Sequence, residues 1–200
     1  MFQKLIVSIA LTAAVAVAQA QATPDALVKQ ISTDVLDAVR TDKSIQSGDI
    51  SKITALVDSK VMPSVNFEIA TRSAVGPQWR SATPEQRTKL MTEFKTLLLR
   101  LYSGALTQVK DEKVEITKTL PVTGSTQVVV QSEVRGKGEP IKLDYRLDKP
   151  ADAPAWKIID VNVGGIWLVQ NYRAHFAGEL TKGGNDGLIN ALAERNKAKS

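Results

Sequence analysis

The 200-residue chain has no cysteine and one histidine, and these shortages remove several classes of chemistry. Without cysteine there is no disulfide framework and no lipoprotein acylation site. His175 has no evident partner for general base catalysis, and no serine lies in a nucleophile-elbow sequence. The carboxylates are scattered rather than spaced as a metal-binding loop. We therefore predict no metal, no other cofactor and no enzymatic activity.

The chain also lacks an apolar run of the roughly 20 residues that a transmembrane helix needs. The apolar run from Leu5 to Val17 is short, follows Lys4, and precedes small-residue cleavage sequences that end at Ala20 or Ala22. This arrangement is typical of an export signal. We predict a signal peptide over residues 1–22, with an uncleaved anchor as the alternative. Residues 23–200 then form a single mature domain, which we expect in a bacterial periplasm.

The formal net charge of +5 gives a basic surface. Such a surface suits anionic headgroups, nucleic acid or an acidic protein partner, and export argues against nucleic acid. Gly164-Gly165 is not a phosphate-binding loop, because no Lys-Ser or Lys-Thr pair follows it.

Helical signals dominate the first half of the mature chain and its end. Predicted helices begin at Thr23-Pro24, at Asp49, at Pro63, at Thr83 and at Ile166, and a last one begins near Asn185-Asp186. The strongest signal is the capping box from Thr83 to Gln86, which precedes a broad apolar stripe that ends at Val109.

Between residues 114 and 163 the apolar period changes from helical to two. Strands are predicted over 114–120, 128–134, 141–147 and 156–163. Short turns join them, so an antiparallel sheet is expected. Helices, then a meander, then helices predict an α+β fold: a twisted four-stranded antiparallel sheet packed against several helices.

The stretch from Trp156 to Leu180 combines a strand, a glycine break and an amphipathic helix, and its inward positions are nearly all large and apolar. No catalytic set accompanies them. An exported protein with this pattern favours an apolar ligand over a polar substrate.

Three blocks of sequence resemble the MlaC family of periplasmic phospholipid-binding proteins, also called the toluene-tolerance auxiliary components of ABC transporters. The blocks are Ala74–Arg87 with the long helix after it, Trp156–Phe176, and Gly184–Leu192. The chain departs from the family pattern at three positions. Gly164 stands where Glu is usual, Trp167 stands where Ser is usual, and Ile159 stands where Tyr is common. We expect the bulky Trp167 to narrow or reshape the ligand cavity.

The resemblance implies a fold similar to a nuclear-transport-factor-like cone, with phospholipid acyl chains held between sheet and helices and the headgroup near solvent. It also implies two partners: an inner-membrane ABC transporter with an MCE-domain subunit, and an outer-membrane lipoprotein–porin complex. Lipid shuttled between them would maintain outer-membrane lipid asymmetry. We expect a monomer. The alternatives are a secreted hydrolase on a cone-like fold and an adaptor with a filled core.

The predicted lining of the lipid site combines inward strand residues with facing helix residues. The strand residues are Val128, Val130, Leu143, Tyr145, Val161 and Val163, and the helix residues are Phe67, Leu98, Leu101, Tyr102, Leu168 and Tyr172. The alternative is that these side chains simply fill a solid core.

Several polar and aromatic residues outside this set also have two interpretations. Asp160 lies in an apolar strand and needs a partner, for which Arg173 or Arg80 is predicted. A clamp between strand and helix is favoured over headgroup contact. Trp79 is placed either at the pocket mouth or as a plug below the long helix. Four arginines could present cations to a phosphate or form a solvated face: Arg72, Arg80, Arg87 and Arg173.

Overall fold

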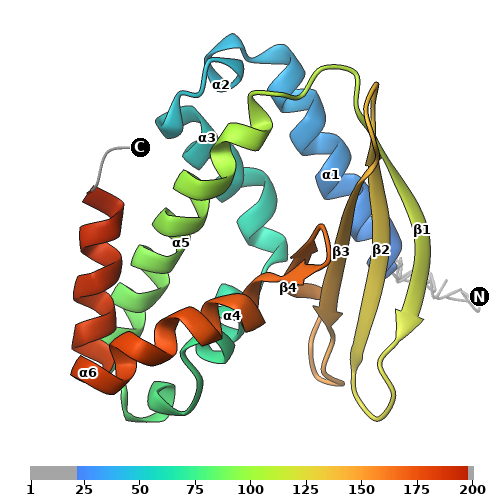
Figure 1. Cartoon of the computed structure of the whole chain (residues 1–200). Helices are drawn as coiled ribbons and strands as arrows, with labels where there is room; N and C mark the ends of the chain where they lie inside the picture. The colour runs from blue at the N-terminus through green and yellow to red at the C-terminus, as the bar shows by residue number, and fades with distance from the viewer. Residues whose placement is uncertain (1–21, 198–200) are drawn as a thin grey trace, which may run out of the picture.

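The computed structural model describes residues 22–197, so the predicted signal peptide, apart from Ala22, lies outside the described residues. The chain forms an antiparallel meander, which follows one group of helices in the sequence, precedes the last helix, and lies at one edge of the molecule (Figure 1). In this view the sheet and helix α5 occupy opposite sides of the molecule. Helix α6 joins them at the bottom, and α1 to α3 join them at the top (Figure 1). The predicted α+β class is confirmed.

The N-terminal helices begin and end largely where local signals place them. Helix α1 spans Pro24–Thr41, and α3 spans Ile50–Leu56 with the Asp49 carboxylate accepting from the Ser51 and Lys52 amides. A four-residue helix that the sequence did not predict, α2, lies between them at Lys43–Gln46. Short turns of π-helix (η1, Val57–Val61) and 3-10 helix (η2, Met62–Ser64) lead onward.

Helix α4 (Phe67–Val75) begins later than the Pro63 signal predicted, because the Asn66 side chain caps it. Gly76 ends it with a φ of 74°, a left-handed conformation that favours glycine. A 3-10 turn, η3 (Gly76–Ser81), leads into α5 (Pro84–Leu106). Both hydrogen bonds of the predicted capping box between Thr83 and Gln86 are present.

The sheet has five strands in the order β1-β2-β3-β4-β5, so the prediction of four strands is wrong. The strands are β1 (Lys113–Pro121), β2 (Gln127–Arg135), β3 (Ile141–Asp148), β4 (Lys157–Val163) and β5 (Ile166–Trp167). The extra strand arises because Gly164 and Gly165, with φ of 59° and 95°, turn the chain back onto β4. The following helix, α6, therefore begins at Leu168 rather than at Ile166.

Helix α6 runs from Leu168 to Lys197 and bends sharply at Gly184, where φ is 59° and ψ is −152°. The bend separates the two helices that the sequence predicted at this end of the chain.

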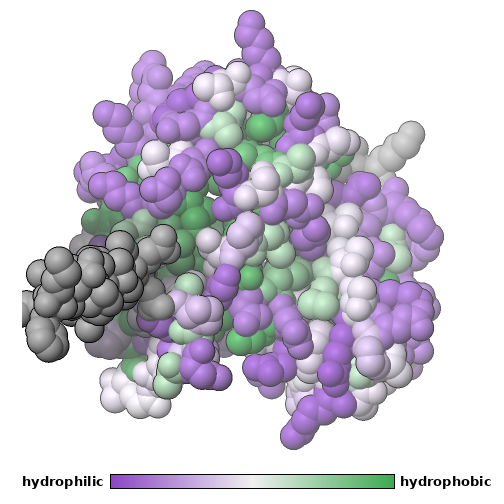
Figure 2. Space-filling model, turned by 180° about the vertical axis from the view of Figure 1, so that it is seen from behind, coloured by the Kyte–Doolittle hydropathy of each residue, from purple (hydrophilic) through white to green (hydrophobic). Residues whose placement is uncertain are grey.

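Most of the buried apolar side chains belong to one of three clusters. The helical cluster joins α4, α5 and α6 and includes Phe94, Tyr172 and Phe176. The sheet cluster joins α1 to one face of the sheet through Val28, Val130, Leu147 and Ile158. A third cluster joins α1, α2, α3 and the end of α5 through Val39, Ile45, Ile53 and Leu56. Seen from behind, apolar surface is visible between polar side chains near the middle of the molecule (Figure 2).

Candidate functional site

The six predicted strand residues share one face of the sheet. In the pairing register Val130 lies opposite Tyr145, which in turn lies opposite Val161. Leu143 lies opposite Val163, and Val128 lies two residues from Val130 on the same strand. Paired residues project to the same face, and so do alternate residues along a strand. The structure therefore brings these six side chains together.

The six side chains differ in how deeply they are buried. Val130 is 0% exposed and belongs to the sheet cluster beneath α1, as part of a filled core. Val128, Tyr145 and Val161 pack against the same cluster and are partly buried. Leu143 and Val163 are also partly buried but belong to none of the three clusters. The end of the face near these two residues is thus the less filled end.

The six predicted helix residues come from α4, α5 and α6. Tyr172 is 4% exposed within the helical cluster, where its ring meets the edge of Phe94 at 4.9 Å between centroids. Three residues pack against that cluster and are partly buried: Phe67, Leu98 and Leu168. Leu101 and Tyr102, in contrast, are 60% and 37% exposed. The twelve predicted residues thus lie on two apolar walls. The sheet wall contains the six strand residues and is anchored in the sheet cluster, and the helical wall contains the six helix residues and is anchored in the helical cluster.

Tyrosine hydroxyls are the polar groups among these residues, and all the shifts found for them favour the neutral form. Burial raises the pKa of Tyr172 to about 12, and its interaction with the Tyr102 hydroxyl adds to this rise. Burial also raises the pKa of Tyr145, an effect reduced by a hydrogen bond with Ser32 of α1. Both hydroxyls therefore remain neutral hydrogen-bonding groups within largely apolar surroundings.

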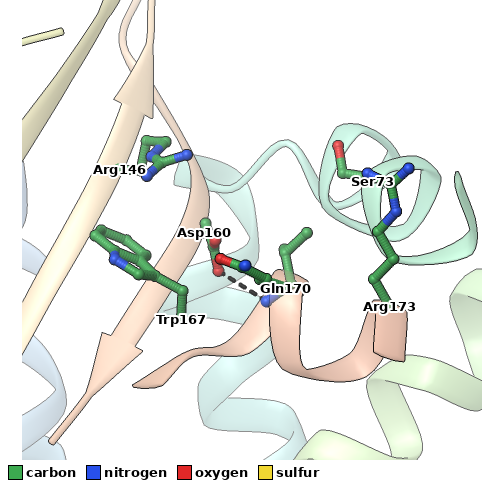
Figure 3. Close-up of a pocket in the computed structure, with 7 residues that line it drawn as sticks. Ser73, Arg146, Asp160, Trp167, Gln170 and Arg173 are labelled. Carbon is green, nitrogen blue, oxygen red and sulfur yellow. Dashed lines mark hydrogen bonds between the residues drawn. The ribbon is translucent and has the colours of Figure 1, made fainter. Parts of the chain in front are cut away.

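A hollow of about 470 Å³ lies elsewhere, where β3 and β4 meet the start of α6. Its lining consists of Ser73, Arg146, Asp160, Trp167, Val169, Gln170 and Arg173. Arg146 and Trp167 lie on one side, Ser73 and Arg173 lie on the other, and Asp160 and Gln170 lie between them (Figure 3). None of the twelve predicted lining residues belongs to it.

The hollow is on the opposite face of the sheet from the predicted lining. Arg146 pairs with Asp160 in the register, one position along from the pair of Tyr145 and Val161. Neighbouring residues in a strand project to opposite faces. The sequence singled out Asp160, Trp167 and Arg173 but missed Arg146, which appears there as one more polar residue in an alternating strand.

Asp160 connects strand β4 to helix α6, as the predicted clamp requires, but the predicted partners are wrong. Its Oδ1 accepts from the backbone amides of Val161 at 2.8 Å and Val169 at 3.0 Å. Neither Arg173 nor Arg80 forms an ion pair with it in the described part of the chain. Burial raises the pKa of Asp160, and the two amide bonds and the Arg146 charge oppose that rise.

Two other aromatic residues are placed unambiguously. The guanidinium of Arg146 stacks over the Trp167 ring at 4.6 Å from its centroid, so Trp167 faces the hollow and does not narrow the space beside Val161. Trp79 is buried in the helical cluster below α5, which confirms the plug rather than the mouth, and Arg87 lies over its ring at 5.4 Å. His175 is exposed on α6.

Among residues 22–197 there is no group of three or more histidine or acidic residues arranged to hold a metal ion. The same residues include no helix with the length and apolar character needed to cross a bilayer.

Comparison with known proteins decides the family. A profile described as "MlaC protein" matches residues 29–194. The chain belongs to the MlaC family.

Two named bacterial proteins are similar to this chain over most of its length. The intermembrane phospholipid transport system binding protein MlaC of Haemophilus influenzae is 24% identical over 177 residues, which are 88% of this chain and 83% of that protein. The toluene tolerance protein ttg2D of Pseudomonas putida is 23% identical over 165 residues, which are 82% of this chain and 76% of that protein.

A solved structure extends the similarity to three dimensions. The phospholipid-binding protein from Ralstonia solanacearum, determined in complex with a phospholipid, is 39% identical to this chain. The match has a TM-score of 0.82 and covers 88% of this chain and 97% of that one. The two proteins therefore share the same arrangement of antiparallel meander and helices.

Proposed function

We propose that this chain binds a phospholipid in the periplasm and carries it between the two membranes. The similarity to a solved structure that contains a phospholipid carries the proposal, because it covers almost the whole of both chains at 39% identity. The separate clusters support it. On this proposal, acyl chains lie between an apolar sheet face and an apolar helical wall that belong to separate clusters.

We place the acyl chains against the less filled parts of the two walls. On the sheet these are Leu143 and Val163, with Val161 beside them, and on α5 they are Leu101 and Tyr102, with Leu98 beside them. Val130 and Tyr172 then act as the packed floor of each wall. The finer likeness to a nuclear-transport-factor-like cone remains part of this proposal.

The energetics of the cargo dictate how the protein must work. Burial of a methylene group contributes about 0.8 kcal/mol, so two ordinary acyl chains represent on the order of 20 kcal/mol of transfer free energy. Release into water would be very slow. The protein must therefore hand the lipid over while docked, so that the chains pass between apolar sites.

The MlaC family suggests the two docking partners: an inner-membrane ABC transporter with an MCE-domain subunit, and an outer-membrane lipoprotein–porin complex. On this proposal the protein acts as a monomer, uses no cofactor, catalyses no reaction and serves outer-membrane lipid asymmetry. Any energy input then belongs to the transporter.

Lipid extraction tests the proposal. The exported protein is purified and extracted with organic solvent, and the extract is analysed by mass spectrometry; about one phospholipid per chain is expected. Ester hydrolysis without bound lipid would instead support a hydrolase. Neither lipid nor turnover would support an adaptor with a filled core.

Two substitutions test the position of the acyl chains. Leu143→Trp combined with Val161→Trp should fill the space beside the sheet and lower the lipid content with little loss of stability. Lys142→Trp is the matched control, because Lys142 is exposed and projects from the neighbouring position to the opposite face. Equal lipid content in both variants would place the acyl chains elsewhere.

A further inference from the structure

The cations of the hollow between β3, β4 and α6 have few partners within the protein. Arg146 and Arg173 take part in none of the ion pairs of the described residues. The Nε of Arg146 is buried without a hydrogen-bond partner. Arg173 lies along the backbone of Gly76, where a Cβ would come within 3.4 Å of its Nε. Two guanidinium groups are therefore held beside one hollow with hydrogen-bonding capacity unused.

The charges of the lining add to a single positive charge. Arg146 and Arg173 contribute one each, and Asp160 offsets one of them. Asp160 has a structural task, because its Oδ1 accepts from the amide of Val169 in the first turn of α6. The hollow therefore matches a ligand with one negative charge better than a dianion, which Asp160 would repel.

We propose that this hollow binds the phosphate of a singly charged phosphodiester, the group found in glycerophospholipid headgroups. The lipid source rests on the proposed function, whereas the anion chemistry rests on the hollow alone. The donors come from three elements: Arg146 from β3, Ser73 from α4, and Gln170 and Arg173 from α6. Donors on opposite sides suit a tetrahedral phosphate, whose oxygens point in several directions, better than a planar carboxylate. The positive end of the α6 dipole, at the same hollow, favours an anion further.

The volume of the hollow and its place on the sheet distinguish its proposed ligand from the cargo lipid. About 470 Å³ leaves room for the substituents of a diester, and it falls within the range of small-molecule sites. Arg146 and Asp160 are on the sheet face opposite Tyr145 and Val161. The site is therefore separate from the proposed acyl site, and its ligand is a headgroup other than that of the cargo.

Trp167 positions one of the two cations. Its ring stacks on the Arg146 guanidinium, which holds that group in place while its N–H edges remain directed sideways. Serine at this position would offer the Arg146 guanidinium no such surface.

Titration of the exported protein, stripped of lipid, with soluble glycerophosphoglycerol tests the proposal. The readout is the side-chain Nε–H resonances of the arginines in a ¹⁵N NMR spectrum. Saturable shifts of Arg146 and Arg173 are expected, with a weaker response to inorganic phosphate. Because lipid has been removed, the result does not depend on the acyl site, and lipid content measured separately reports on the proposed function.

Three variants and a control sharpen the test. Arg173→Gln, at an exposed position, should weaken glycerophosphoglycerol binding about tenfold without unfolding the protein. Trp167→Ser should weaken it less, by releasing Arg146. Asp160→Asn should strengthen binding of inorganic phosphate most, because the repulsion of a dianion is removed. Arg100→Gln removes an exposed arginine of α5 outside the hollow and should change nothing.

Three results would overturn the proposal. The first is the absence of saturable shifts at Arg146 and Arg173. The second is equal weakening by Arg173→Gln and Arg100→Gln, which would indicate general attraction to a basic surface. The third is tighter binding of a glutamate-rich peptide than of glycerophosphoglycerol at the same residues, which would assign the hollow to an acidic protein partner.

Discussion

Asp160 connects a strand to a helix without forming an ion pair. Its carboxylate accepts hydrogen bonds from two backbone amides: that of the next residue, Val161, and that of Val169, nine residues further along the chain. The geometry resembles a helix cap supplied from a neighbouring strand, which fixes the direction in which α6 leaves the sheet. The Asp160 carboxyl group is partly buried, and burial raises its pKa.

The raised pKa of Asp160 predicts a pH dependence of stability. The folded state binds this proton more tightly than the unfolded state, so the contribution of Asp160 to the free energy of unfolding falls as the pH rises from about 3.8 through the raised value. Asp160→Asn keeps the Oδ1 acceptor and loses the titration. Urea midpoints of wild type and variant are measured from pH 4 to 7.5. The wild-type midpoint should fall relative to that of the variant as the pH rises.

Asp144→Asn, on the same sheet face, is the control for this difference. A wild-type advantage over Asp160→Asn that grows with pH would contradict the assigned direction.

At the scale of elements, the bend in α6 depends on one glycine. Gly184 has a φ of 59° with a ψ of −152°, a combination that residues with a Cβ avoid. Gly184→Ala should lower the free energy of unfolding by about 1–3 kcal/mol. Gly178→Ala, in the straight part of the same helix with open space around it, should raise it by about 0.5–1 kcal/mol. Denaturant unfolding measures both, and effects of the same sign would refute the role given to the bend.

The start of α5 depends on the capping box. Thr83→Ala removes the side-chain bond to the Gln86 amide and should cost about 1 kcal/mol. Thr88→Ala, one turn further on, removes a hydroxyl that bonds back to the Pro84 carbonyl inside the helix and should cost close to nothing. Thermal unfolding of the two variants provides the comparison; similar losses would mean that the box adds little.

At the scale of the whole molecule, the cargo should stabilise the fold that holds it. A ligand that binds only the folded state contributes about 4 kcal/mol at a thousand times its dissociation constant. Removal of phospholipid should therefore lower the urea midpoint. Amide hydrogen exchange should speed up most around Leu98 and Leu143, and least around Val130, which α1 covers regardless of cargo.

Uniform loss of protection across the three clusters would contradict the proposed position of the lipid. The position of the acyl chains would then have to be sought away from the sheet face.

The sequence predicted those features that short stretches determine by themselves. The box at Thr83, the cap at Asp49 and the start of a last helix near Asn185 need only neighbours within a turn, and the alternation along β3 identified one sheet face. Features that arise from tertiary contacts were missed. The two-residue strand β5 exists only through its pairing with β4, and the acceptor role of Asp160 is satisfied by a distant backbone amide.

The same limit applies to the candidate site. Periodicity placed Val130 and Leu101 in one set, yet Val130 is fully buried while Leu101 is mostly exposed, because depth depends on where α1 lies. The hollow at Arg146 escaped notice because a polar residue in an alternating strand normally faces water. The stacked partner, Trp167, comes from a strand that the sequence did not predict.

The division of the buried side chains into three clusters has a consequence for how such a protein can diverge. Each wall of the proposed acyl site is anchored in a cluster of its own, and four of the residues placed against the acyl chains belong to no cluster: Leu143, Val163, Leu101 and Tyr102. Selection can therefore exchange those residues, and so retune the lipids accepted, while the parts that keep the chain folded are inherited unchanged.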